Sequence, residues 1–144
     1  MSRLPLVGVE EIGSSGPILD ITIRPVGTRL AGFSARGLID TGASVVCISQ
    51  RIADQLNLTL VNQDRLDVAG GGSVHANIYS GYLAVSLLNF EEIMPLYAVR
   101  MPYASHNVLL GRDFLRHFLM TFDGPNGRFH FSRPPTPMIE DLDG

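Results

Sequence analysis

Gly37-Leu38-Ile39-Asp40-Thr41-Gly42-Ala43-Ser44 is the most informative stretch of the chain. It carries one acidic side chain, that of Asp40, out of an apolar strand and directly into a turn of small residues. Burying a carboxylate is unfavourable unless several donors face it, and small residues let backbone N–H groups approach closely enough to be those donors. The pattern therefore predicts a carboxylate held for chemistry. The plainer alternative is a turn-forming Asp, which is common in such sequences.

With Ile39 before it and apolar residues at 45–48 after it, this motif resembles the active-site loop of aspartic proteases. A second motif, Val108-Leu109-Leu110-Gly111-Arg112-Asp113-Phe114-Leu115, is similar to the segment that retroviral-type aspartic proteases (retropepsins) place beside that loop. Between the two, Asp67-Val68-Ala69-Gly70-Gly71-Gly72-Ser73-Val74 stands where the family has a glycine-rich flap over the substrate. The resemblance covers residues 18–131, and the distant second motif favours the chemical interpretation of Asp40.

The resemblance implies an all-β fold, a retropepsin-like acid protease barrel with one or two short helices. We expect a flexible N-terminal arm at residues 1–17, the protease domain at 18–132, and a mobile, Pro-rich and acidic tail at 133–144. A length of 144 residues agrees with one domain, and 45% hydrophobic with 17% charged residues suits a compact core.

Chain length also predicts the assembly. Peptide hydrolysis of this kind uses two carboxylates that share a proton: the ionised one activates a water, and the protonated one donates to the carbonyl oxygen. The chain has a single Asp-Thr-Gly. The resemblance therefore implies a two-fold symmetric homodimer that takes its second Asp40 from the symmetry mate and acts on a polypeptide substrate.

Local patterns predict the elements around these motifs. Alternation predicts strands at 18–23, 30–39, 79–87 and 93–99, with Leu83, Val85 and Leu87 on one face, and regular structure is expected to begin near Ile18. Apolar residues at helical spacing predict a short helix from Ser49 to about Asn57 and a second helix through Leu110, Phe114 and Phe118. The segment 122–129 is typical of a hairpin.

The resemblance assigns roles to the residues of the first motif. Asp40 is the expected catalytic residue, Thr41 is expected to donate its hydroxyl across the dimer axis, and Gly42 brings an N–H close to the carboxylate. Ala43 has no donor where pepsin-like enzymes carry Ser or Thr, so the dyad should keep its shared proton more readily. We therefore expect activity at mildly acidic to near-neutral pH. Flap and substrate-binding residues are expected at Ala69, Gly70, Gly71, Gly72 and Ser73.

Gly111, Arg112 and Asp113 are expected to be structural residues at the base of the site. In retroviral relatives the arginine pairs with an acidic residue, but the corresponding position here is Ser44. That ion pair cannot form, so we expect Arg112 to bond to backbone carbonyls or to another carboxylate. The alternative for Arg112 and Asp113 is direct contact with substrate.

Several other functions are disfavoured by composition and spacing. The net charge of −3 and the scattered basic residues argue against nucleic-acid binding. No Gly-Lys-Ser/Thr follows the three glycines, as a phosphate loop requires. The four histidines lack metal-ligand spacing, so no metal or cofactor is expected. Cys47 is the single cysteine, so the chain cannot form an internal disulfide. We interpret it as a core residue rather than a nucleophile.

The apolar stretch Leu4–Val9 is too short and too broken to be a signal or a membrane span. We expect a cytoplasmic protein or a soluble domain of a larger precursor. Two functions stay open from the sequence: an aspartic endopeptidase, and a non-catalytic peptide-binding or dimerisation module on the same fold.

Overall fold

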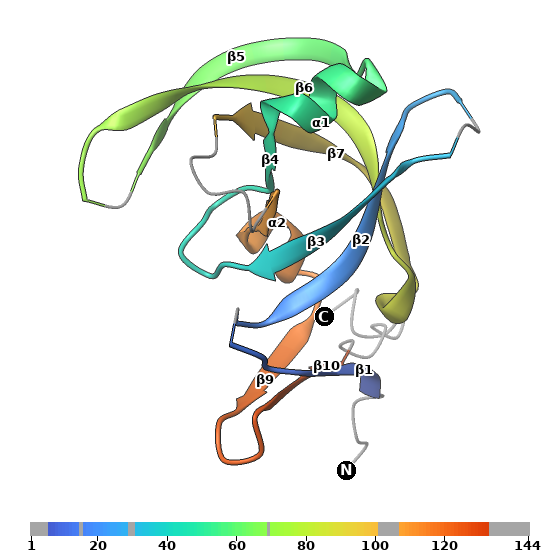
Figure 1. The fold of residues 1–144 in the computed structure, drawn as a ribbon, viewed down its shortest axis with the longest axis vertical. Coiled ribbons are helices and arrows are strands. Elements are labelled where there is room, and N and C mark those ends of the chain that lie inside the picture. The colour runs from blue at the N-terminus through green and yellow to red at the C-terminus, as the bar shows by residue number, and fades with distance from the viewer. Residues whose placement is uncertain (1–5, 15, 29–30, 69, 101–106, 133–144) are drawn as a thin grey trace, which may run out of the picture.

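The described chain forms two β-sheets, one of which closes into a barrel (Figure 1). The computed structural model describes residues 6–14, 16–28, 31–68, 70–100 and 107–132. A three-stranded sheet has the order β1 (Leu6–Glu11), β10 (Arg128–Ser132), β9 (Leu119–Asp123). A seven-stranded sheet has the order β2 (Ile18–Pro25), β3 (Phe33–Ile39), β8 (Val108–Leu110), β4 (Cys47–Ser49), β7 (Phe90–Val99), β6 (Ser73–Val85), β5 (Thr59–Asp67).

An additional pairing between β2 and β6 closes six of these strands into a barrel and leaves β5 as an extension of β6. The helical segments are α1 (Gln50–Leu56), α2 (Arg112–Leu115) and the 3-10 turn η1 (Ser86–Leu88). The predicted all-β barrel with short helices is thereby confirmed. None of the helices in the described ranges is long and apolar enough to span a bilayer.

The barrel core follows from strict alternation along the strands. In β2 the side chains of Leu19, Ile21 and Ile23 are buried, while the intervening residues face outward. On β3 the neighbouring Ile39 is also buried, one residue before Asp40. Hydrophobic burial on the inner face thus fixes the register of the strand that ends at the acidic residue.

Aromatic side chains join α2 to both sheets. The ring of Phe114 on α2 meets Phe90 of β7 edge-to-face, with 5.0 Å between ring centroids. Phe118, just after α2, packs 5.7 Å from Phe131 of β10, which in turn lies 5.6 Å from Phe129. Such pairs add to the stabilisation that burial provides. They fix the three-stranded sheet against the end of the barrel that carries α2.

The structure corrects three local expectations. Regular structure begins at β1, not near Ile18, because β1 pairs antiparallel with β10 inside the segment 1–17 that we expected to be a flexible arm. The predicted helix through Leu110 shrinks to four residues, because Leu110 belongs to β8. Leu87 is 42% exposed, because β6 ends at Val85 and the chain turns through η1. The tail at 133–144 lies outside the described residues.

Candidate functional site

Asp40 lies where two distant segments meet. Strand β3 runs parallel to β8, and the backbone N–H of Asp40 donates to the carbonyl of Leu110 (3.0 Å). The chain then turns, with the Ala43 N–H donating to the carbonyl of Asp40 (3.1 Å). Within the turn, the Gly42 N–H donates to Asp40 Oδ1 at 3.0 Å. A backbone donor close to the carboxylate was the arrangement that the small residues predict, and Asp40 itself remains partly exposed.

The segment from Gly111 to Asp113, predicted to form the base of the site, supports this turn through hydrogen bonds. The guanidinium Nη1 of Arg112 donates to the carbonyl of Thr41 (2.8 Å), and its backbone N–H donates to the carbonyl of Ala43 (2.9 Å). A carbonyl was one of the two partners expected for Arg112. The backbone of Gly111 packs so tightly against Val45 that an added Cβ would lie 2.3 Å from the Val45 carbonyl oxygen. Only glycine fits there.

Asp113 occupies an unusual position beside this turn. Its backbone N–H donates to the carbonyl of Ser44 (3.2 Å), yet both of its carboxylate oxygens are buried and accept no hydrogen bond from the described residues. Burial raises the pKa of this carboxyl, and the backbone N–H groups of Val46 and Phe114 and the charge of Arg116 offset only part of the rise. The carboxylate is thus buried beside the turn, and a structural role for Asp113 stays a prediction.

A row of side chains on the face next to Asp40 was not foreseen from the sequence. Strand register aligns Leu38 with Leu109, Leu109 with Cys47, and Cys47 with Tyr97. Directly paired residues point to the same side of a sheet. Leu38, Leu109 and Tyr97 are each partly exposed, whereas their sequence neighbours Ile39, Leu110, Leu96 and Ala98 are buried in the core. Leu38, Cys47, Tyr97 and Leu109 therefore face away from the core, and we call these four residues the apolar row.

Cys47 is the buried member of the apolar row. Cys47 is 8% exposed. Burial of its thiol, with smaller contributions from the charges of Asp113 and Asp40, raises the pKa of the thiol to about 11. A thiol with this pKa stays protonated near neutral pH and is a poor nucleophile.

The residues predicted to form a flap lie on the β5–β6 hairpin. Its tip is closed by two backbone bonds, Val68 N–H to the Gly72 carbonyl and Gly71 N–H to the Val68 carbonyl, both 3.2 Å. Gly70, Gly71 and Gly72 all have positive φ, which explains the run of glycines. Below the tip, Arg65 Nε donates to the hydroxyl of Ser73 (2.9 Å). Ala69 lies outside the described residues.

Strand register also defines which side of the hairpin faces the apolar row. Ile78 of β6 is paired with Tyr97, so it lies on the same face as that row. Two residues apart along β6, Ala76 and Val74 share this face, and Leu66 of β5 is paired with Val74. The hairpin therefore carries apolar side chains on the face it shares with the row. In Figure 1 its tip and the loop after β3 lie on the same side of the molecule.

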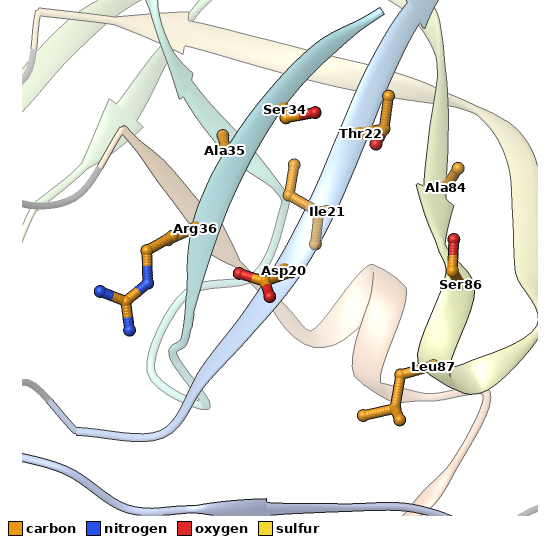
Figure 2. Close-up of a pocket in the computed structure, with 9 residues that line it drawn as sticks. All are labelled: Asp20, Ile21, Thr22, Ser34, Ala35, Arg36, Ala84, Ser86 and Leu87. Carbon is orange, nitrogen blue, oxygen red and sulfur yellow. The ribbon is translucent and has the colours of Figure 1, made fainter.

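A cavity in the described residues lies elsewhere. Its volume is about 610 Å³, and it is drawn in Figure 2 on the outer side of β2 and β3, against η1. Asp20 and Thr22 of β2 contribute to it, with their cross-strand partners Arg36 and Ser34. No predicted site residue lines this cavity. This cavity is therefore separate from the site that the motif predicts.

The described ranges also contain no group of three or more His, Cys, Asp or Glu side chains placed to hold a metal ion. The structure thus brings Asp40, the Gly42 N–H and the Arg112 guanidinium together, and Leu38 and Leu109 of the apolar row lie next to them on β3 and β8. Thr41 is exposed at the surface of the single chain. The apolar row could have been found only from strand register, because nothing in the local sequence pairs positions 38, 47, 97 and 109.

Comparison with known proteins gives a family model and several similar folds. The model of a family described as "gag-polyprotein putative aspartyl protease" matches residues 26–117. None of the curated protein sequences matches the chain. A retropepsin-like aspartic protease from Rickettsia conorii is similar with a TM-score of 0.58 and 15% identity, over 85% of this chain and 95% of that one. The EIAV protease, solved with the inhibitor HBY-793, is similar with a TM-score of 0.52 and 16% identity, over 69% of this chain and 85% of that one.

A longer protein also matches, over less than half of its own length. The aspartic proteinase from Irpex lacteus is similar with a TM-score of 0.50 and 14% identity. The matched region covers 88% of this chain but only 46% of the Irpex lacteus chain. At these identities the structures show the fold, which is retropepsin-like.

Proposed function

Because this chain belongs to the gag-polyprotein aspartyl protease family, we propose that it is an aspartic endopeptidase that works as a homodimer. The observation that carries the proposal is the geometry of Asp40. One carboxylate ends a core-anchored strand, receives a backbone N–H from Gly42, and stays partly exposed above a base made by Arg112. A turn-forming Asp would need none of the long-range support.

The proposal needs a second chain. A single described chain brings one Asp-Thr-Gly carboxylate to the site, whereas hydrolysis by a shared proton requires two. Its fold corresponds to 46% of the Irpex lacteus proteinase, which supports a site assembled from two copies of this unit. A two-fold axis beside the loop would set Asp40 against its symmetry mate, with Thr41 of each chain positioned to bond to the other loop.

In the proposed reaction, the ionised Asp40 takes a proton from a water while the water oxygen forms a bond to the scissile carbonyl carbon. The protonated Asp40 of the partner subunit donates its proton to the carbonyl oxygen, which gives a tetrahedral diol. The protonated carboxyl then gives its proton to the amide nitrogen as the C–N bond breaks. The other Asp40 takes a proton from the diol hydroxyl that becomes the new carbonyl, so the pair is left with one proton again. Each transfer is general acid–base catalysis by a positioned carboxyl group.

The apolar row gives the substrate a place to lie. We assign Leu38, Cys47, Tyr97 and Leu109 to the floor of the substrate site, and the β5–β6 hairpin to a flap whose Val74 and Leu66 face that floor. An extended peptide between the two would gain main-chain hydrogen bonds and bury alternate side chains. Apolar side chains flanking the cleaved bond are therefore expected to be preferred.

A peptide-library cleavage profile tests the proposal. Wild type is compared with Asp40→Asn, which removes the titrating carboxylate, and with Asp123→Asn, a matched change on β9 away from the loop. We expect Asp40→Asn to lose at least about 10³-fold in cleavage rate while still dimerising, and Asp123→Asn to cleave normally. Cleavage that survives Asp40→Asn would remove the enzyme hypothesis. Peptide binding by wild type without any cleavage would instead favour the peptide-binding module.

A further inference from the structure

Another cavity lies on the side of the β5–β6 hairpin that faces away from the apolar row. Its volume is about 500 Å³. Arg65 of β5 is paired with His75 of β6, and both alternate along their strands with the apolar residues that face the row. Both line the cavity, as do Asn77 of β6, Gln50 of α1 and Arg100, which directly follows β7. Side chains from four segments thus surround it.

The charge of this hairpin cavity has one sign. Arg65, Arg100 and His75 line it, and no Asp or Glu of the described residues does. Asp67 lies on the same face of β5 by alternation, but it neither lines the cavity nor forms an ion pair with either arginine. Three other cavities in the described residues each have a carboxylate in their lining. In a chain of net charge −3, the hairpin cavity therefore stands out as a place that attracts negative charge.

The guanidinium of Arg65 is held in place by the hairpin itself. Its Nε donates to the Ser73 hydroxyl (2.9 Å), and its Nη2 donates to the Ser73 carbonyl (3.3 Å). Its Nη1 donates to no group of the described residues. A guanidinium that is already ordered loses little side-chain entropy when it binds a ligand, and its planar fork matches carboxylate and phosphate oxygens. Arg65 is therefore a preformed anchor for an oxyanion.

Other lining residues are ordered by a chain of side-chain hydrogen bonds that starts on α1. Gln50 Nε2 donates to Asp54 Oδ1 (2.9 Å), so the Gln50 oxygen faces Asn77, whose Nδ2 donates to it (3.0 Å). The Asn77 oxygen in turn lies 3.0 Å from Nε2 of His75. Since the carboxylate accepts at the start of the chain, each amide has one orientation, and His75 donates from Nε2. Three residues of the lining are thus fixed before a ligand binds.

We propose that this cavity binds a small organic molecule that carries two or more anionic oxygen groups, either carboxylates or phosphates. Two oxyanions are needed because Arg65 belongs to the hairpin and Arg100 lies at the end of β7, and neither forms an ion pair with a described carboxylate. A volume of about 500 Å³ lies within the range of small-molecule sites and is more than one inorganic ion fills. The amide and hydroxyl groups of the lining add neutral hydrogen-bond partners.

The place of the cavity connects its occupant to the hairpin. In the register, β6 pairs with β7 from Asn77 onward, so residues 73–76 and the tip extend past the end of β7 (Figure 1). A molecule that binds both Arg65 and Arg100 would hold the hairpin to the barrel. Its effect on cleavage rests on the proposed function, because it takes the hairpin as the flap. A flap that is held opens more slowly, so the bound molecule should slow cleavage.

Isothermal titration calorimetry of the full chain tests the site. The probes are citrate, whose anionic groups are carboxylates, and pyrophosphate, whose anionic groups are phosphates. Arg100→Gln removes a guanidinium from the lining, and Arg51→Gln is the matched control, because Arg51 is exposed on α1 and does not line the cavity. We expect Arg100→Gln to weaken binding of the tighter probe about tenfold or more, and Arg51→Gln to weaken it less than about twofold.

The order of the two affinities identifies the ligand. Tighter binding of citrate would assign the site to carboxylates, and tighter binding of pyrophosphate would assign it to phosphorylated molecules. Arg100 and Arg51 are both exposed, so both variants should fold, which a thermal melt checks. Failure of both probes to bind wild type would overturn the site. Equal weakening by Arg100→Gln and Arg51→Gln would overturn it as well, since the attraction would then be general to the surface.

Amide hydrogen exchange tests the connection to the hairpin. At saturation with the tighter probe, exchange at residues 65–75 should slow by about threefold or more, while exchange in the β9–β10 hairpin at 122–129 should not change. At the same probe concentration, Arg100→Gln should show no slowing at 65–75. Equal exchange at 65–75 with and without bound probe would show that the occupant does not hold the hairpin.

The inference and the proposed function fail separately. If a probe binds and slows exchange at the hairpin of a chain that cleaves no peptide, the site is right and the endopeptidase is wrong. If wild type cleaves peptides, Asp40→Asn does not, and neither probe binds, the endopeptidase stands and the site is wrong. Arg100→Gln without any probe should cleave at the wild-type rate, because Arg100 acts only through the bound molecule.

Discussion

The site loop at 40–44 and the hairpin tip at 68–72 are both short turns that contain glycine, yet they are held in different ways. The loop receives hydrogen bonds from residues about seventy positions away, through the Arg112 side chain and the backbone at 112–113. Among the described residues, the hairpin tip is closed by local bonds between Val68, Gly71 and Gly72. Long-range support suits a group that must keep its position, and local support suits a segment that must open.

Glycine serves a different purpose in each region. At Gly111 the need is for space, because the Val45 backbone occupies the volume of a side chain. At Gly71 space is free, with nothing within 4 Å of an added Cβ, and the need is for a backbone angle of +94°. A substitution should therefore be costly in the supported region and milder in the hairpin. The following variants test that contrast.

Gly111→Ala should have the largest effect. The added Cβ would lie 2.3 Å from the Val45 carbonyl oxygen, and backbone atoms cannot move aside without displacing the loop. We expect a loss of about 3 kcal/mol in stability and a melting temperature roughly 10 °C lower. Thermal denaturation followed by circular dichroism measures it. Gly124→Ala is the control, since its Cβ would have one contact at 3.9 Å, and an equal loss there would refute the steric argument.

Arg112→Leu should come next. It removes the charged donor to the Thr41 carbonyl but leaves the backbone bonds of residues 112 and 113 in place. Because Arg112 is exposed, we expect only about 1 kcal/mol in stability. Misplacement of the loop should lower kcat about tenfold, with KM little changed. The exposed Arg51→Leu on α1 is the control. Equal kcat values for the two variants would show that Arg112 does not position the loop.

Gly71→Ala should have a smaller and more local effect. An alanine at a φ of +94° is strained but meets no neighbour, so we expect a cost of about 1 kcal/mol. Amide hydrogen exchange should speed up at 68–72 and remain unchanged at 40–44. Faster exchange at both places would mean that the hairpin and the loop are coupled rather than held independently.

Asp113→Asn should have the smallest effect, and its sign should depend on pH. Burial raises the folded-state pKa of Asp113 above its ordinary value of 3.8. The stabilisation linked to its protonation is therefore present below that value and is lost as the pH rises through the raised pKa. We expect Asp113→Asn to melt higher than wild type at pH 7 and to lose that advantage at pH 3.

Asp123→Asn is the matched opposite. Hydrogen bonds from Asn126 lower the pKa of Asp123, so its stabilising contribution is present above 3.8 and is lost as the pH falls through the lowered value. This variant should melt lower than wild type at pH 7 and converge with it in acid. The same sign of change in both variants at pH 7 would contradict the burial argument for Asp113.

The sequence was most predictive where the signal is local. Alternation before Asp40 predicts β3, and the spacing after Ser49 predicts α1, and both are confirmed. The resemblance also predicted that Gly111 and Arg112 lie beside the loop at 40–44. The local sequence of either segment alone does not predict that contact. The assignment of Asp40 as the catalytic residue stays a prediction.

The sequence was least predictive where long-range pairing decides. β1 was missed because its pairing with β10 joins the two ends of the described chain, and no short pattern carries that information. The apolar row was missed for the same reason, since Leu38, Cys47, Tyr97 and Leu109 come from four strands. The buried carboxylate of Asp113 also gave no signal, because its sequence neighbours suggest only a helix start.

The long sequence separation between the Asp40 loop and Arg112 has a consequence for the newly synthesised chain. The Arg112 bond spans 71 positions, and β3 pairs with β8 across a similar distance. Until residues 108–113 have left the ribosome, the loop lacks the hydrogen bonds from Arg112 and Asp113, even if the earlier strands have already formed. Closing so long a stretch is also slow, because its entropy is lost before the contacts form. The loop that carries Asp40 thus lacks this support until residues 108–113 have been synthesised.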